Sequence, residues 1–241
     1  MMRQRGKAYP NQPDPGQIDL FEENRRDAAN VQSDAAKLFE LSVDAFYTVV
    51  HARMSELPIE REIVRFIGKV GKAKDRAAAA RIAFDRGDPD VLAVQKAARK
   101  ALWEIHRITG FLRFSPDPRG VYTARCGPDC FILPALAEHF RLRFGETPWA
   151  IIDERRGLRL YRETGGEVRL IPASASSGPA LQEDRDTDGD PREDPWEDLW
   201  RLYHHSVSNE ARKNPKLQRQ FMPERYRKYL PEFKVDINRL V

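Results

Sequence analysis

Three polar side chains in the middle of the chain have the chemistry of an acid–base or phosphate site. His139 and Arg143 are four positions apart, which puts them on one face of a helix, and Asp153 follows them. A guanidinium donates paired hydrogen bonds to a phosphate, and a histidine adds a titratable donor. Asp153 with His139 is also a candidate acid–base pair for hydrolysis or base excision. The structural alternative places His139 at a core edge and pairs Arg143 with a carboxylate such as Asp153.

The C-terminal segment combines basic side chains with aromatic rings, as nucleic-acid-binding surfaces do. Cations there would neutralise phosphates, and tyrosines would stack on unpaired bases. The predicted nucleic-acid-binding residues are Arg113, His139, Arg143, Arg156, Arg201, Arg212, Lys213, Lys216, Arg219, Arg225, Tyr226, Arg227 and Lys228. Two alternatives remain open: the aromatic residues lock a solvated basic segment onto the core, or the segment binds an acidic stretch of the same chain.

Trp196, Trp200 and Tyr203 recur at helical spacing, and we interpret them as core residues rather than a base-stacking platform. His204 and His205 are adjacent, so on a helix they point about 100° apart. With no third ligand evident, we interpret both histidines as surface residues.

Cys126 and Cys130 have the spacing that opens the cluster motif of radical SAM enzymes, but Leu133 stands where the third cysteine would be. Two thiolates do not hold an iron–sulfur cluster, and structural zinc usually has four ligands. We therefore expect no metal and no cofactor. Walker A, G-x-G-x-x-G, G-x-S-x-G and H-E-x-x-H motifs are absent, so the sequence does not favour an enzyme.

The charge of the chain is unevenly distributed. It has 41 basic and 37 acidic residues and a net charge of only +4. Seven of the acids are concentrated in one stretch: Glu183, Asp184, Asp186, Asp188, Asp190, Glu193 and Asp194. The rest of the chain is clearly basic, which is typical of a protein that binds nucleic acid. Two cysteines, no apolar run of about 18 residues and no signal-peptide pattern predict a cytoplasmic protein.

Hydrophobic periodicity and turn residues predict an α+β protein. Residues 1–33 are expected to be a disordered tail, and 34–110 a helical region whose last helix starts at Asp88 and Pro89. Residues 111–172 are expected to form an antiparallel sheet with one packed helix, 131–144; its strands are 111–114, 121–124, 149–152, 158–161 and 168–171. An acidic linker, 173–195, and a basic, aromatic-rich helical segment, 196–241, complete the chain.

Several runs of sequence resemble one known bacterial family. They are HRITGFLRF (106–114), VYTA (121–124), LPALAEHFRLRF (133–144), WAIIDERRG (149–157) and the long run from Leu199 to Phe233. Together they resemble a domain of unknown function described as a probable DNA metabolism protein. Members of that family are encoded beside a radical SAM protein thought to modify or repair DNA, or are fused to uracil-DNA glycosylase-like domains.

The resemblance implies a process, DNA metabolism, but no particular reaction. It covers residues 106–233, and the two cysteines lie outside its pattern. The positions that match are Arg113, Phe114, Tyr122, His139, Phe140, Arg143, Phe144, Trp149, Asp153, Arg156, Trp200, Arg201, Tyr203, Arg212, Asn214, Pro223, Tyr226, Leu230 and Glu232.

Three functions are therefore compatible with the sequence. The first is a DNA metabolism or repair accessory protein that binds DNA, a radical SAM or uracil-DNA glycosylase-like partner, or both. The second is an enzyme that acts on nucleic acid through His139 and Asp153. The third is a protein-interaction module whose acidic linker mimics DNA.

Overall fold

The computed structural model describes residues 35–117, 119–175, 199–200, 202–203, 206–209, 212 and 214–233. The expected N-terminal tail, most of the expected acidic linker, and Arg201 and Lys213 lie outside these ranges. The chain divides into two compact units, one made of residues up to Val50 with Pro58–Lys96, the other of His51–Leu57 with Ala97–Val241. Within the described ranges, no helix combines the length and apolarity needed to cross a membrane.

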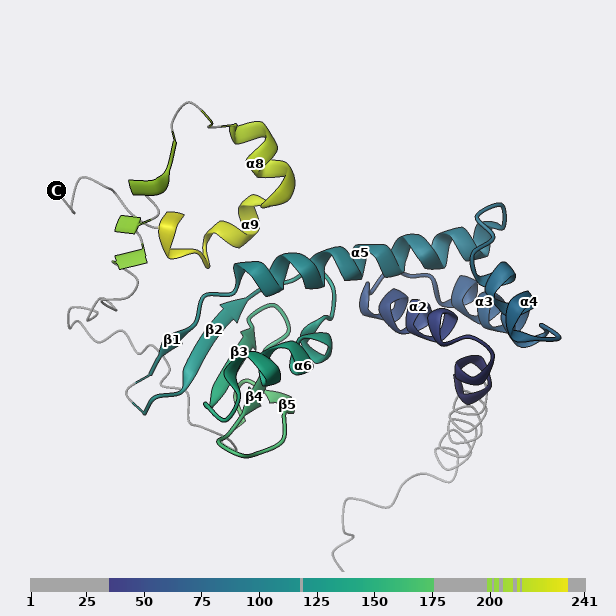
Figure 1. The fold of residues 1–241 in the computed structure, drawn as a ribbon, viewed down its shortest axis with the longest axis horizontal. Coiled ribbons are helices and arrows are strands. Elements are labelled where there is room, and N and C mark those ends of the chain that lie inside the picture. The colour runs from purple at the N-terminus through teal and green to yellow at the C-terminus, as the bar shows by residue number, and fades with distance from the viewer. Residues whose placement is uncertain are drawn as a thin grey trace, which may run out of the picture. The chain divides into compact units, whose positions relative to one another are not determined.

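The first unit is helical, as its apolar periodicity predicts. It contains α3 (Glu60–Gly71), α4 (Arg76–Ala83), most of α2 (Val43–Met54) and the start of α5 (Pro89–Phe111) (Figure 1). Ile63, Phe66 and Val70 form the buried stripe of α3, so the expected second helix is confirmed.

The predicted start of the long helix α5 is confirmed in its capping contacts. The Asp88 Oδ1 atom accepts hydrogen bonds from the backbone N–H groups of Asp90, at 2.9 Å, and Val91, at 3.2 Å. Pro89 occupies the first helical position, where its missing N–H group has no cost. Lys69 of α3 binds the carboxylates of Asp88 and Asp90 at 2.5 and 2.7 Å, which ties α3 to the start of α5.

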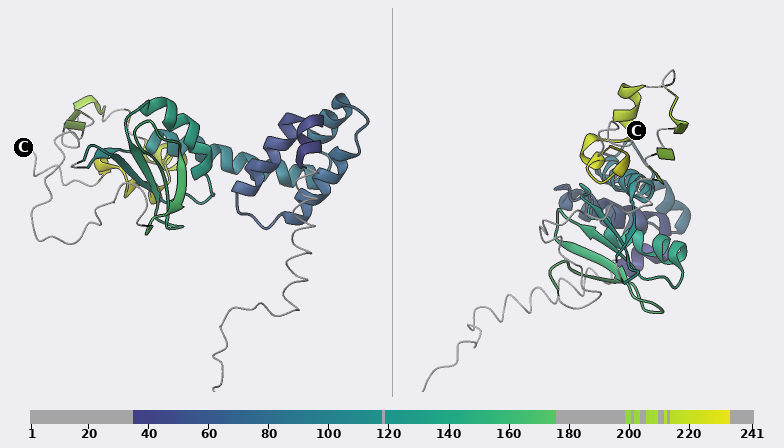
Figure 2. Two further views of the ribbon diagram at one scale, coloured as in Figure 1. Left: turned by 90° about the horizontal axis from the view of Figure 1, so that it is seen from below. Right: turned by 90° about the vertical axis from the view of Figure 1, so that its left-hand side faces the viewer.

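The second unit contains a five-stranded mixed sheet in the order β1-β2-β3-β4-β5. The strands are β1 (Ser115–Pro116), β2 (Tyr122–Cys126), β3 (Trp149–Asp153), β4 (Leu158–Arg162) and β5 (Arg169–Pro172). Helix α6 (Leu133–Phe144) connects β2 to β3 and contacts β3 and β4 (Figure 2). Gly157, at a φ of 61°, makes the tight turn between β3 and β4.

The α+β class is confirmed, with two differences of detail. Strands β2 and β3 are parallel, whereas the other three pairs are antiparallel as expected. The expected strand at 111–114 is not formed, because α5 continues to Phe111 and β1 begins at Ser115. The hairpin is therefore shorter than its sequence indicated.

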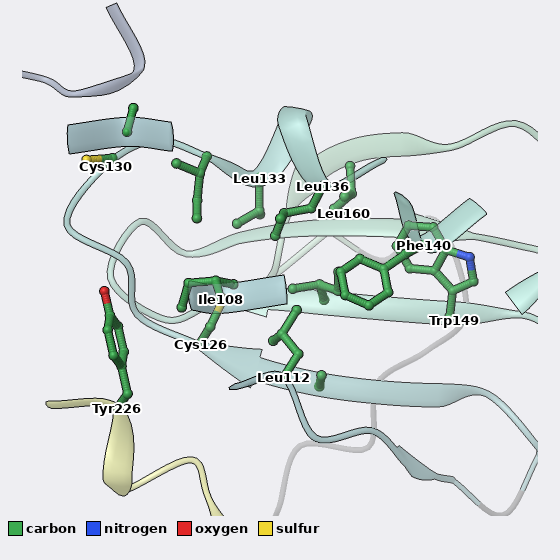
Figure 3. Packing of buried hydrophobic residues seen from close by; sticks show 14 residues of the cluster. Ile108, Leu112, Cys126, Cys130, Leu133, Leu136, Phe140, Trp149, Leu160 and Tyr226 are labelled. Carbon is green, nitrogen blue, oxygen red and sulfur yellow. The ribbon is translucent and has the colours of Figure 1, made fainter. Parts of the chain in front are cut away.

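The core of the second unit lies among α5, α6 and the sheet, and it includes Ile108, Leu136, Phe140 and Trp149 (Figure 3). Helices α8 (Pro215–Phe221) and α9 (Glu224–Arg227) and a short 3-10 helix, η2 (Pro231–Phe233), follow near the end of the chain. Figure 3 shows Tyr226 reaching from this segment toward the core. The C-terminal segment is therefore anchored by packing as well as by charge.

Candidate nucleic-acid-binding site

A recess of about 470 Å³ opens in the second unit, where the end of α5, the start of β2 and the end of α6 meet. We call it the arginine–aromatic recess. Its lining residues are Gly110, Leu112, Arg113, Phe114, Tyr122, Arg143, Phe144 and Trp200. Six of these eight residues are arginines or aromatic residues, and they come from four separate parts of the chain.

Arg113 is held in a fixed orientation at one side of the recess. Its Nη1 atom donates to the carbonyl oxygen of Gly110 at 2.9 Å, and its Nη2 atom donates to Oε1 of Glu232 at 2.9 Å. The guanidinium carbon lies 5.4 Å from the ring centroid of Trp200, whose indole N–H donates to the other Glu232 oxygen. The Glu232 carboxylate therefore already forms an ion pair with this arginine. The Nε atom of Arg113 is buried and has no hydrogen-bond partner in the part of the chain that the structure describes.

Arg143 supplies the second cation of the recess. It lies in the last turn of α6 and is exposed. Among the described residues it has neither a hydrogen-bond nor an ion-pair partner, in contrast to Arg141 on the same helix, which binds Glu138 at 2.7 Å. Its guanidinium is therefore available to an anion.

The aromatic rings of the recess pack against one another and against the core. The Phe114 and Phe144 centroids are 4.8 Å apart, and those of Tyr122 and Phe144 are 5.6 Å apart. Phe144 in turn stacks on the buried Trp149, with 6.3 Å between the two ring centroids. Because these rings are anchored from below, they offer a rigid surface on which a planar group can stack.

The recess brings together two predicted residues, Arg113 and Arg143, with rings that the sequence analysis named only as matches to the family resemblance, without a binding role. Trp200, interpreted as a core residue from its helical spacing, is 38% exposed and lines the recess. His139 is exposed and makes an edge contact with Phe140 at 4.8 Å, but it does not line the recess. Guanidinium groups beside stacked rings suit a nucleotide, whose phosphate and base need these two partners.

The candidate acid–base pair is not assembled. Asp153 is completely buried, and its Oδ1 atom accepts from the backbone N–H groups of Arg155 and Arg156. Its Oδ2 atom binds Nη1 of Arg156 at 2.8 Å. Over the described part of the chain, His139 makes no contact with Asp153. The geometry therefore gives no support to acid–base chemistry at these residues.

Arg156, expected to contact nucleic acid, uses its whole guanidinium inside the protein. It binds the Asp153 carboxylate, both Glu56 oxygens, and the carbonyl oxygens of Pro128 and Asp129. Burial opposes its charge, but the Glu56 and Asp153 hydrogen bonds raise the pKa of Arg156. The pKa of Glu56 is lowered, chiefly by its hydrogen bond with Arg156. These contacts are those of a structural cation, and they give no support to the predicted nucleic-acid contact of Arg156.

The contacts of Tyr226 are also structural. It is 1% exposed, packs against Phe111 at 5.9 Å and donates its hydroxyl hydrogen bond to Glu104. No face of its ring is free to stack on a base. Tyr226 therefore matches the alternative stated above, in which aromatic residues of the C-terminal segment pack onto the core.

Several C-terminal cations are also engaged. Arg225 binds Asp129 at 2.7 Å and lies over the Tyr226 ring, and Lys228 is 3.4 Å from Glu154. Arg227 lies over the Phe233 ring at 5.3 Å. The remaining predicted cations of this segment that the structure describes are exposed: Arg212, Lys216 and Arg219. They are the C-terminal residues still placed to meet a phosphate.

Glu104 is a buried carboxylate that sequence reasoning missed. It is 4% exposed, and it accepts from the backbone N–H groups of Asp129 at 2.8 Å and Cys130 at 2.6 Å, and from Tyr226. Burial raises its pKa, but the side-chain hydrogen bonds of Cys130 and Tyr226 and the two backbone bonds outweigh it, so the pKa lies below 4.5. An acid on the apolar face of a helix, between Ala101 and Ile108, was the available signal.

The two cysteines are free thiols and both are buried. Burial, aided by the carboxylates of Asp153 and Glu154, raises the pKa of Cys126. Burial and the hydrogen bond with Glu104 raise the pKa of Cys130 to about 12. Among the described residues, no group of three histidine, cysteine or acidic side chains could hold a metal ion.

No curated protein and no solved structure matches the chain. The family model of DUF4130, a domain of unknown function, matches residues 59–232, which is more than half of the sequence and includes most of the second unit and residues 59–96 of the first. The chain therefore belongs to the DUF4130 family.

Proposed function

We propose that this protein is an accessory protein of DNA metabolism that binds DNA through the arginine–aromatic recess. The observation that supports the proposal is the meeting of Arg113 and Arg143 with the rings of Tyr122, Phe144 and Trp200 in one recess, where Arg143 has no ion-pair partner among the described residues. Guanidinium groups bind phosphate oxygens in pairs, and aromatic faces stack on bases regardless of sequence. A volume of about 470 Å³ is within the range of small-ligand sites, so one nucleotide unit is a reasonable occupant.

Arg143 is the cation that meets a phosphate first in this proposal. Arg113 already holds the Glu232 carboxylate, so a second anion must share or displace that contact. The exposed Lys216 and Arg219 of α8 add charge that attracts DNA at longer range.

Replacing Arg143 by alanine should weaken binding to single-stranded DNA about tenfold, because one charge-assisted phosphate contact is lost. The measurement is fluorescence anisotropy with a labelled oligonucleotide across a salt series. The slope of log affinity against log salt should become shallower by about 0.7, the value for one phosphate contact on a single strand.

The matched control for this measurement is Arg141→Ala. Arg141 lies on the same helix two positions earlier, but it pairs with Glu138 and does not line the recess. Its loss should leave both affinity and salt slope near wild type. Equal binding by wild type and Arg143→Ala, or binding without salt dependence, would contradict the proposed role of the recess.

We further propose a cytoplasmic protein that works beside a radical SAM or uracil-DNA glycosylase-like partner, as the family resemblance of residues 106–233 implies. The full chain used as bait in a nuclease-treated extract should recover such a partner. Nuclease treatment distinguishes a protein contact from joint binding to DNA. Recovery of neither partner would leave DNA binding as the whole of the proposed function.

A further inference from the structure

Helix α5 presents a basic and aromatic face away from the core of the second unit. Arg99, Trp103, His106 and Gly110 recur every three or four residues and are all exposed. On the opposite side, Ala101, Ile108 and Leu112 are buried in the core. Trp103 is 51% exposed and makes an edge contact with the His106 ring at 6.4 Å. An indole exposed to this extent beside cationic side chains offers a face on which an unpaired base can stack.

The charge of this face suits a polyanion. Between Ala97 and Phe111 the helix carries one carboxylate, Glu104, which is buried. Arg99 and Arg107 have no ion-pair or hydrogen-bond partner within the described part of the chain. The arginines of the C-terminal segment near the core, in contrast, are held by carboxylates or rings. Over the described ranges, the positive charge of Arg99 and Arg107 on either side of Trp103 is therefore not paired with a carboxylate.

The exposed face of α5 leads into the arginine–aromatic recess. Gly110 lines the recess and lies seven positions after Trp103, so both occupy nearly the same angular position on the helix. At 1.5 Å per residue the separation along the axis is about 10 Å. That distance is too long for one nucleotide to bridge from the recess to the indole, but short enough for a strand of a few nucleotides.

We propose that the α5 face and the recess form one track for a single-stranded DNA segment several nucleotides long. This inference rests on the proposed function, which supplies DNA as the ligand. Trp103 stacks on an unpaired base, and Arg99 and Arg107 bind the phosphates that flank it. A duplex hides the faces of its bases, so the stacking contact requires a single strand.

The test compares labelled oligothymidylates of two, four and eight nucleotides with duplexes of eight base pairs. Wild-type affinity should rise from the dinucleotide to the octanucleotide and should be lower for the duplex. Trp103→Ala should weaken octanucleotide binding about tenfold, the usual effect of losing one stacked base, and leave dinucleotide binding unchanged. Trp103→Phe, which keeps an aromatic face, should restore most of the affinity.

Leu102→Ala is the matched control, since Leu102 is a neighbouring exposed apolar residue, 45% exposed, on a different face of α5. It should bind every oligonucleotide as wild type does. If Trp103→Ala binds the octanucleotide normally while Arg143→Ala does not, the proposed track along α5 is wrong, whereas DNA binding by the recess is supported. If wild type binds no oligonucleotide at all, the proposed function fails and the track fails with it.

Discussion

Replacing Arg156 by methionine should lower the free energy of unfolding of the second unit by about 3–5 kcal/mol, the usual cost of removing one partner of a buried ion pair. Asp153 is completely buried, and without Arg156 its carboxylate keeps only two backbone N–H donors. The carbonyl oxygens of Pro128 and Asp129 lose their guanidinium donor as well. Methionine keeps most of the aliphatic stem, so the loss reports on charge and hydrogen bonds rather than on packing.

Urea unfolding followed by tryptophan fluorescence reports on the second unit, because all four tryptophans lie between Trp103 and Trp200 and belong to that unit. A thermal scan should show a fall in Tm of about 10 °C, given about 2–4 °C for each kcal/mol in a chain of this size. Asp153→Asn introduced beside Arg156→Met should recover part of the loss, because it removes the uncompensated charge.

Arg155→Met is the control for Arg156→Met. Arg155 is the preceding residue and also forms an ion pair, with Asp129 at 3.0 Å, but its side chain is 54% exposed. An exposed pair of this kind contributes about 0–1 kcal/mol. If the two variants lost similar amounts of unfolding free energy, the buried network around Asp153 would contribute no more to stability than an exposed ion pair does.

The helical part of the fold was predictable because its signals are local. Apolar spacing placed Phe66 and Val70 on one face of α3, and the Asp88–Pro89 pair marked the start of α5. The end of α5 depends on a distant contact. Helix through Gly110 costs about 1 kcal/mol relative to alanine, and Phe111 is held there by Tyr226, far along the chain.

The direction of β3 relative to β2 could have been predicted from spacing. Antiparallel neighbours are joined by short turns, whereas a parallel pair needs a crossover of a dozen or more residues. The helix predicted at 131–144 supplies such a crossover between the two strands, so the parallel pairing was already implied. The antiparallel expectation came from the hairpin turns and the order of the elements, and it did not take into account that the helix between the second and third strands is a crossover.

The candidate site was predictable by residue type but not by grouping. Arg113 and Arg143 were identified as phosphate-binding cations, and both line the recess. Arg156 is of the same type but pairs with the buried Asp153, because strand β3 ends with that carboxylate inside the protein. A sequence does not show which arginine finds an internal carboxylate, since the partners are set by the tertiary fold.

Lowering the pH should destabilise the second unit through Glu104. The folded pKa of this carboxyl lies below its ordinary value of 4.5, so the folded state binds its proton less tightly than the unfolded state does. Its contribution to stability is therefore complete above pH 4.5 and is lost as the pH falls through the folded pKa. Protonation of Glu104 weakens its bonds with the Asp129 and Cys130 N–H groups and with Tyr226.

Glu104→Gln should be less stable than wild type at pH 7 by about 2–4 kcal/mol, because hydrogen bonds to a buried charge contribute about 1.5–3 kcal/mol each and the amide replaces an acceptor by a donor. Its unfolding free energy should then change less than that of wild type between pH 7 and pH 3. The difference between the two curves isolates Glu104 from the other carboxylates that titrate in this range.

Two further variants separate the charge of Glu104 from the packing of the C-terminal segment. Tyr226→Phe removes one donor to the carboxylate and keeps the ring in the core, so it should reproduce part of the loss at pH 7. Glu138→Gln changes an exposed acid whose pKa is lowered chiefly by its hydrogen bond with Arg141, and it should leave the acid profile unchanged. If Glu104→Gln and wild type lose stability in parallel on acidification, Glu104 is not the group that couples acid to the anchoring of this segment.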